Sequence, residues 1–117
     1  MSLVEQLIEL RDFLVPENGP DRLVKVWLHS AEDSSGMPVT PTSSSAIRFC
    51  VWGGAAKLTD YGYSYYELKN FLNKTNNDGK WKKFYFSSNN FWFASPHSAK
   101  EVRSFLDAAI AYAKETK

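Results

Sequence analysis

The sequence predicts an α+β fold with about four helices around a central buried helix over residues 46–57 and one or two short antiparallel hairpins. Three observations predict this class. Apolar residues recur at helical spacing in several segments, serines stand where helices need caps, and two aromatic and β-branched stretches have the length of strands. With 117 residues and 15% aromatic residues, the chain is expected to form a single domain, 1–117, around one hydrophobic core.

The first helix is predicted to run from Ser2 to about Leu14. Ser2 and Glu5 have the spacing of a capping box, and leucines and isoleucines continue an apolar face along the segment. Pro16 and the Asn18-Gly19-Pro20 turn end this helix, because proline cannot continue it and asparagine-glycine tolerates positive φ.

A hairpin is predicted next. Residues 23–28 are rich in β-branched and aromatic side chains, and residues 37–40 are expected to return beside them after a turn at 34–36. Pro38 and Pro41 would confine the returning segment to a sheet edge or to irregular structure, since proline cannot donate a ladder hydrogen bond.

The central helix is predicted over residues 46–57, with Ser45 as its cap. Two adjacent glycines inside a helix cost about 1 kcal/mol each relative to alanine. Gly53 and Gly54 therefore predict that another element approaches this helix closely. The apolar positions follow helical spacing: Ile47, Cys50, Val51, Gly54 and Leu58.

Two later helices are predicted from their caps. Ser64 precedes a helix over residues 65–74, in which these side chains are expected to be partly buried: Tyr66, Leu68, Phe71 and Leu72. Ser98 and Glu101 form a second capping box at the start of the last helix. Its expected buried face consists of Val102, Phe105, Leu106, Ala109, Ile110 and Ala113.

An aromatic hairpin is predicted from residues 81–86 and 91–94. A strand that is aromatic on both faces is typical of a core. If its outer face is uncovered, however, aromatic rings beside lysines mark a binding surface for a protein partner or for self-association. The candidate binding residues are Trp81, Lys82, Lys83, Tyr85 and Trp92.

Single-stranded nucleic acid is an alternative ligand, since bases stack on aromatic rings. The lysines that would follow a strand are Lys69, Lys74, Lys80, Lys82 and Lys83. The near balance of fourteen Lys and Arg against thirteen Asp and Glu disfavours this ligand.

Other features of the sequence indicate the cellular location. No apolar run approaches the length of a membrane span, and a single cysteine fits a reducing compartment. A cytoplasmic protein with no membrane contact is therefore expected.

Cys50 is the candidate nucleophile, with His97 or His29 as base and Asn89 or Asn90 as the orienting group. A cysteine on the same helical face as other apolar residues is more often a buried structural residue. Arg48 is expected either to pair with an acidic residue such as Asp33 or to be solvated.

No metal or cofactor is expected. One cysteine and two distant histidines do not have the spacing of zinc ligands. Asp33 and the residues up to Gly36 lack the repeated acidic ligands of a calcium loop and are expected to form a turn. Gly53-Gly54 is not followed by the lysine-serine step of a phosphate loop.

Two blocks carry a resemblance to a known family: Ala31-x-Asp33-x-x-Gly36-x-Pro38-Val39 and Ala46-x-Arg48-Phe49-Cys50-x-x-Gly53. Together with the capped helix after Ser98, they resemble a family of small uncharacterised proteins of bacteria and their phages, a domain of unknown function. That family usually has tryptophan where this chain has Phe49. The resemblance implies a similar fold and a bacterial or phage setting, and no particular activity.

The leading hypothesis is a non-enzymatic binding protein, such as an accessory protein of a phage or mobile element, that engages a protein partner through the aromatic hairpin. Its expected location is the bacterial cytosol or the infected host cell. Two alternatives stay open: a thiol enzyme that uses Cys50, and a single-stranded nucleic-acid binder that uses the segment 80–93.

Overall fold

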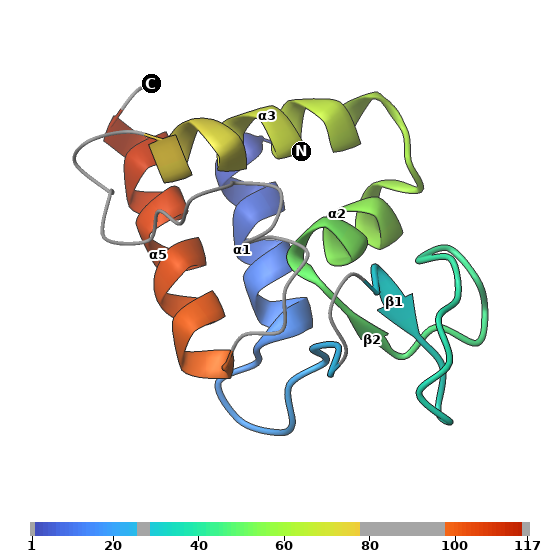
Figure 1. Cartoon of the computed structure of the whole chain (residues 1–117). Helices are drawn as coiled ribbons and strands as arrows, with labels where there is room; N and C mark the ends of the chain where they lie inside the picture. The colour runs from blue at the N-terminus through green and yellow to red at the C-terminus, as the bar shows by residue number, and fades with distance from the viewer. Residues whose placement is uncertain (1, 26–28, 78–97, 116–117) are drawn as a thin grey trace.

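A computed structural model describes residues 2–25, 29–77 and 98–115. Within them it confirms the α+β class, with four helices and one two-stranded antiparallel sheet (Figure 1). The elements are α1 (Leu3–Leu14), β1 (Ala31–Glu32), β2 (Arg48–Phe49), α2 (Val51–Thr59), α3 (Tyr63–Asn77) and α5 (Ala99–Glu115). The predicted aromatic hairpin at 81–94 lies outside the described residues.

Both predicted capping boxes are present. The Glu5 amide donates to Ser2 Oγ at 3.1 Å, and the Ser2 amide donates to Glu5 Oε1 at 2.8 Å. The Glu101 amide donates to Ser98 Oγ at 3.1 Å, and the Ser98 amide donates to Glu101 Oε1 at 3.2 Å. Each box satisfies backbone donors that the first turn of a helix leaves unpaired, so α1 and α5 begin where local sequence places them.

Helix α1 lies among the other three helices and contacts each of them. It runs beside α5 (Figure 1). Arg11 Nη1 of α1 donates to Asp107 Oδ1 of α5 at 2.9 Å. Leu7, Leu10 and Leu14 are fully buried on its inner face. These leucines are the centre of the hydrophobic core.

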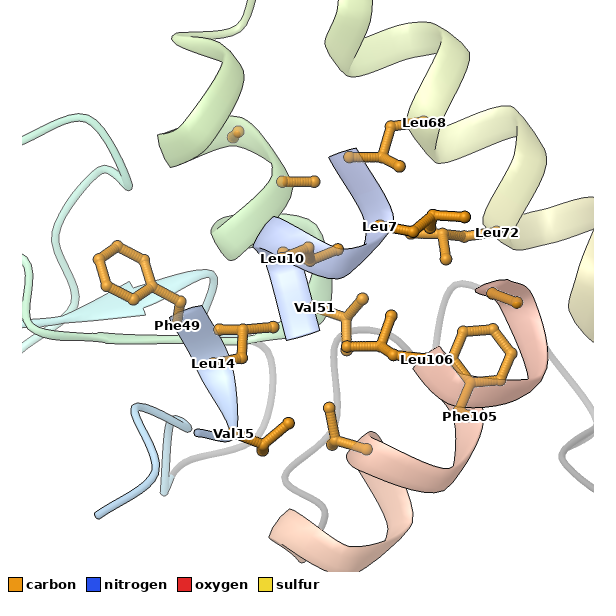
Figure 2. Close-up of a cluster of buried hydrophobic side chains, with 14 of the residues drawn as sticks. Leu7, Leu10, Leu14, Val15, Phe49, Val51, Leu68, Leu72, Phe105 and Leu106 are labelled. Atoms are coloured by element: carbon orange, nitrogen blue, oxygen red, sulfur yellow. The ribbon is translucent and has the colours of Figure 1, made fainter. Parts of the chain in front are cut away.

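The other helices and β2 add their apolar side chains to this core (Figure 2). Helix α3 contributes Leu68 and Leu72, and β2 contributes Phe49. The predicted buried face of the last helix is confirmed at all six positions: Val102, Phe105, Leu106, Ala109, Ile110 and Ala113. Burying such side chains contributes about 1.5–3 kcal/mol each and is the main source of stability.

The sheet differs from the predicted hairpin of residues 23–28 and 37–40. Strands β1 and β2 pair in antiparallel register, with Ala31 opposite Phe49 and Glu32 opposite Arg48. Leu23 forms a parallel bridge with Phe49, and residues 26–28 lie outside the described part. The Asp33 amide donates to the Met37 carbonyl, and residue 38 bridges to Glu32. The segment at 37–40 therefore returns beside β1, and Pro38 lies at a sheet edge as expected.

The predicted first residue of the helix over 46–57 was wrong. Helix α2 begins at Val51, and Cys50, rather than Ser45, is its N-cap. Arg48 and Phe49 are extended because they pair with β1, and this long-range pairing overrides a helical pattern read from nearby residues. Helix α3 also begins earlier than predicted, at Tyr63, so Ser64 lies inside it and does not cap it.

No helix in the described part of the chain is both long and apolar enough to cross a bilayer.

Candidate functional site

The candidate residues from the sequence fall into two groups. One group lies outside the described residues. It consists of the five hairpin residues, the candidate base and its two orienting groups: Trp81, Lys82, Lys83, Tyr85, Trp92, His97, Asn89 and Asn90. The motif residues lie around the sheet and the start of α2: Asp33, Gly36, Pro38, Arg48, Cys50, Gly53 and Gly54.

Asp33 forms the expected turn. Its Oδ1 accepts hydrogen bonds from the Ser35 hydroxyl at 2.7 Å and from the Ser35 and Met37 amides at 2.9 and 3.0 Å. These hydrogen bonds hold the pKa of the Asp33 carboxyl below its usual value, and the bond from the Ser35 hydroxyl has the largest effect. Gly36 has φ +86°, which only glycine adopts without strain. This loop is therefore a self-contained turn.

Arg48 pairs with Glu32 and not with the Asp33 carboxylate that the sequence suggested. Its Nε lies 3.3 Å from Glu32 Oε1, and its Nη2 donates to the backbone carbonyl of Asp33 at 3.2 Å. The strand register explains why Arg48 pairs with Glu32, because the two residues are directly opposite each other in the sheet.

Glu32 is the centre of a buried polar cluster that sequence reasoning missed. Its side chain is 0% exposed, and it accepts hydrogen bonds from Arg48, from His29 Nδ1 at 2.7 Å and from the Lys25 amide at 3.2 Å. Burial raises the pKa of this carboxyl, but the bonds from His29, Lys25 and Arg48 outweigh burial, and the pKa lies below its usual value. The cluster joins the loop before β1 to both strands.

Cys50 is buried, as expected, but for a different reason. It is the N-cap of α2, where its Sγ accepts a hydrogen bond from the Gly53 amide at 3.2 Å. Burial raises the pKa of the Cys50 thiol, although hydrogen bonds from the first-turn amides oppose it. Within the described residues no imidazole bonds the sulfur, since His29 is held by Glu32. A nucleophilic cysteine needs a reachable thiolate and a neighbouring base.

As predicted, other segments of the chain pack closely against both glycines of α2. A Cβ at residue 53 would overlap the backbone carbonyl oxygen of Ser30, and a Cβ at residue 54 would lie 2.9 Å from Leu14 Cδ2 and 3.0 Å from Leu10 Cδ1. Gly53 therefore lets the segment before β1 reach α2, and Gly54 lets α1 pack against it.

An exposed aromatic surface lies where α2 ends and α3 begins. We call it the tyrosine surface and define it as Tyr61, Tyr63 and Tyr66, which are 46%, 82% and 59% exposed. The sequence pattern predicted Tyr66 to be partly buried, and this was wrong. The apolar stripe of α3 passes through Tyr65, Leu68 and Leu72, which places positions 63 and 66 on the opposite side of the helix.

Tyr65 is buried and anchors this surface. Its ring makes T-shaped contacts with the rings of Tyr61 and Tyr66, each with centroids 5.2 Å apart and planes at 70°. Lys69 Nζ lies 5.5 Å from the centroid of the Trp52 ring and 5.8 Å from that of Tyr65. Aromatic and cation–π contacts of this kind fix side chains that would otherwise be mobile on a surface.

The backbone beneath the surface is strained. Asp60 and Tyr61 have φ of +52° and +54°, in the left-handed region that bulky side chains seldom adopt. Asp60 ends α2 as its C-cap. Such conformations cost about 1–3 kcal/mol and are concentrated at functional sites.

Two shallow grooves adjoin the tyrosine surface, with volumes of about 390 and 360 Å³. Both are lined by Gln6 of α1 and Ser64 of α3, and Tyr63 lines the smaller one. Among the described residues, no group of three or more His, Cys, Asp and Glu side chains is placed to hold a metal ion.

Comparisons with protein-family models, with curated proteins and with solved structures found no match for this chain.

Proposed function

We propose that this chain is a non-enzymatic binding protein that engages a protein partner through an aromatic and basic surface. Within the described residues, the tyrosine surface is the proposed aromatic part of this contact. The observation that carries the proposal is that three tyrosines stand exposed together on a strained corner while a buried fourth, Tyr65, holds two of their rings in place.

Tyrosine suits a protein interface for physical reasons. It offers a large contact area with few rotatable bonds, and its hydroxyl bonds to backbone groups of a partner. Tyrosine hydroxyls are neutral at physiological pH, and burial is the main cause that raises the pKa of Tyr61 and Tyr65 further. Rings that are fixed before binding lose less entropy when a partner docks.

The charges around this surface favour a protein over nucleic acid. The segment 57–69, which contains the three tyrosines, has two lysines, Lys57 and Lys69, and two acidic residues, Asp60 and Glu67, so the two signs balance. Lys69 rests on aromatic rings, and Lys74 Nζ lies 5.8 Å from the centroid of the Tyr112 ring. Binding to a phosphate backbone depends on an excess of lysine and arginine. The adjoining grooves provide room for side chains of a partner segment.

The bacterial or phage setting and the cytoplasmic location are part of this proposal. The setting rests on the resemblance carried by the blocks at residues 31–39 and 46–53, and the location rests on the single cysteine and on the lack of an apolar run of membrane length. The hairpin residues Trp81, Lys82, Lys83, Tyr85 and Trp92 remain proposed members of the same binding function.

Affinity capture from a lysate of the encoding organism tests the proposal. The baits are the wild type, a Tyr63→Ser, Tyr66→Ser double variant, and Met37→Ser as a matched control. Met37 is 61% exposed and belongs to the turn after β1, away from the tyrosine surface. We expect a protein that wild type and the control capture equally and that the double variant loses.

Equal capture of that protein by all three baits would contradict the tyrosine surface as the contact. Light scattering of the wild type across a concentration series provides the second readout. A dimer that the double variant abolishes would show that the surface binds a second copy of this chain instead of a different protein.

A further inference from the structure

A larger cavity lies between the loop that follows α1 and strand β2. Its volume is about 560 Å³, within the range typical of small-molecule sites. Three of its lining side chains are cationic, Arg22, Lys25 and Arg48. It shares no residue with the tyrosine surface, so an inference about it is independent of the proposed protein partner.

Backbone pairing places the two arginines side by side. The Phe49 amide donates to the Arg22 carbonyl at 2.7 Å, and the Val24 amide donates to the Phe49 carbonyl at 3.2 Å. Leu23 therefore lies beside Phe49, and both are buried in the core. Because side chains alternate along extended segments, Arg22 and Arg48 project to the other face. The two arginines are therefore neighbours in the backbone, where like charges disfavour each other.

Both guanidinium groups are already held in position. Arg22 Nη1 donates to the Phe13 carbonyl at 2.6 Å, and its guanidinium carbon lies 5.1 Å from the centroid of the Phe13 ring. Arg48 is held by Glu32 and by the Asp33 carbonyl. Each guanidinium has five N–H groups. Within the described residues, the bonds above use one N–H group of Arg22 and two N–H groups of Arg48. The other donors have no partner among the described residues and can bind a ligand.

Two carboxylates, Asp12 and Asp21, also line the cavity. Asp12 Oδ1 accepts from Arg11 Nε at 3.0 Å, and Asp21 Oδ1 accepts from the Leu23 amide at 3.0 Å. The three cations face these two carboxylates, and Arg48 is also paired with the buried Glu32. The site therefore has little net charge, which suits a ligand with a single anionic group and disfavours a polyanion.

We propose that this cavity binds a small organic molecule that carries one phosphate or carboxylate group. Arg22 and Arg48 donate hydrogen bonds to the oxyanion, and the exposed Lys25 ammonium adds charge. Ile47, which is 45% exposed, contacts the apolar body of the ligand. One carboxylate oxygen of Glu32 accepts hydrogen bonds from both Arg48 Nε and the Lys25 amide.

Calorimetric titration of the full chain tests the site with three probes that share one apolar body: phenyl phosphate, benzoate and benzyl alcohol. We expect one of the two anions to bind and the neutral alcohol not to bind, and the tighter anion identifies the ligand class. Arg22→Gln should weaken that anion about tenfold or more, because a hydrogen bond between charged groups is lost. Arg22→Lys should give an intermediate loss, since it keeps the charge without the planar fork.

The matched control is Lys114→Gln on α5, which removes the same charge from an exposed position that does not line the cavity. It should change the affinity less than about twofold. If Arg22→Gln does not fold, Lys25→Gln replaces it and should weaken the anion about threefold or more. No binding of either anion up to about 10 mM, or equal weakening by the cavity variant and the control, would overturn the proposal.

Discussion

Gly53 of α2 lies directly against the backbone carbonyl oxygen of Ser30, with no room for a Cβ between them. The same carbonyl accepts a hydrogen bond from the Cys50 amide at 3.1 Å. The first turn of α2 is therefore docked on the segment that leads into β1. This contact joins the helical part of the molecule to its small sheet.

Gly53→Ala should destabilise the protein by about 1–3 kcal/mol, because the added methyl group overlaps a backbone atom that side-chain rotation cannot move. Gly54→Ala is the matched control. Its methyl group meets only the ends of the Leu10 and Leu14 side chains, and the helix propensity of alanine offsets part of the cost by about 1 kcal/mol. Urea unfolding of both variants checks this, and equal stabilities would contradict the close backbone approach.

Cys50 should act as a cap and not as a nucleophile. Cys50→Ser keeps an acceptor for the Gly53 amide and should change stability little, whereas Cys50→Ala should cost about 0.5–2 kcal/mol. Because the thiol is buried and its pKa is raised, iodoacetamide at pH 7 should label the folded protein far more slowly than the unfolded chain. Labelling of the folded protein faster than of the unfolded chain would support the thiol-enzyme alternative, because only an activated thiolate reacts faster than an unperturbed cysteine.

The features that sequence reasoning placed correctly depend on local chemistry. The capping boxes at Ser2 and Ser98 need only residues three positions apart, and the turn at Asp33 needs only the next four residues. The start of α2 depends instead on the pairing of Phe49 with Ala31 and with the segment at 22–24, which no local pattern reveals.

In the candidate site, too, some features could be predicted from local sequence and others could not. Gly53 and Gly54 could be identified as close contacts, because glycine inside a helix needs a physical reason. The tyrosine surface could have been found by assigning the apolar stripe of α3 first, since Tyr63 and Tyr66 fall opposite it. The partners of Glu32 could not have been found, because they converge from three segments only after folding.

The buried Glu32 cluster predicts a loss of stability in acid. The pKa of Glu32 lies below its unfolded value of about 4.3, so its stabilising effect is complete above that pH and disappears as pH falls through the folded pKa. Glu32→Gln should be less stable than wild type by about 1–3 kcal/mol at pH 7, because it removes bonds between charged groups.

The difference between wild type and Glu32→Gln should shrink below about pH 4, because the carboxyl is then protonated in wild type too. Thermal unfolding from pH 7 to pH 3 measures it. A difference that stays constant across this range would show that Glu32 does not stabilise the fold as an anion.

Asp60→Gly should stabilise the protein by about 0.5–1 kcal/mol, because glycine adopts the left-handed conformation at this C-cap without strain. Calorimetric melting checks the change. Asp107→Gly is the contrasting variant, since residue 107 lies within α5 and glycine there should destabilise it by about 1 kcal/mol or more, because the hydrogen bond from Arg11 is lost as well. A lower melting temperature for Asp60→Gly would contradict the strain assigned to this corner.

The most direct test of the tyrosine surface replaces Tyr66 with the photo-crosslinking residue p-benzoylphenylalanine, which keeps an aromatic ring at this exposed position of α3. The same residue at Met37, an equally exposed position on the turn after β1, is the control. Each variant is irradiated with the captured partner and analysed by mass spectrometry. We predict a covalent adduct with the partner from position 66 and none from position 37. An adduct from position 37 alone, or equal adducts from both positions, would contradict the central claim that the partner docks on the tyrosine surface.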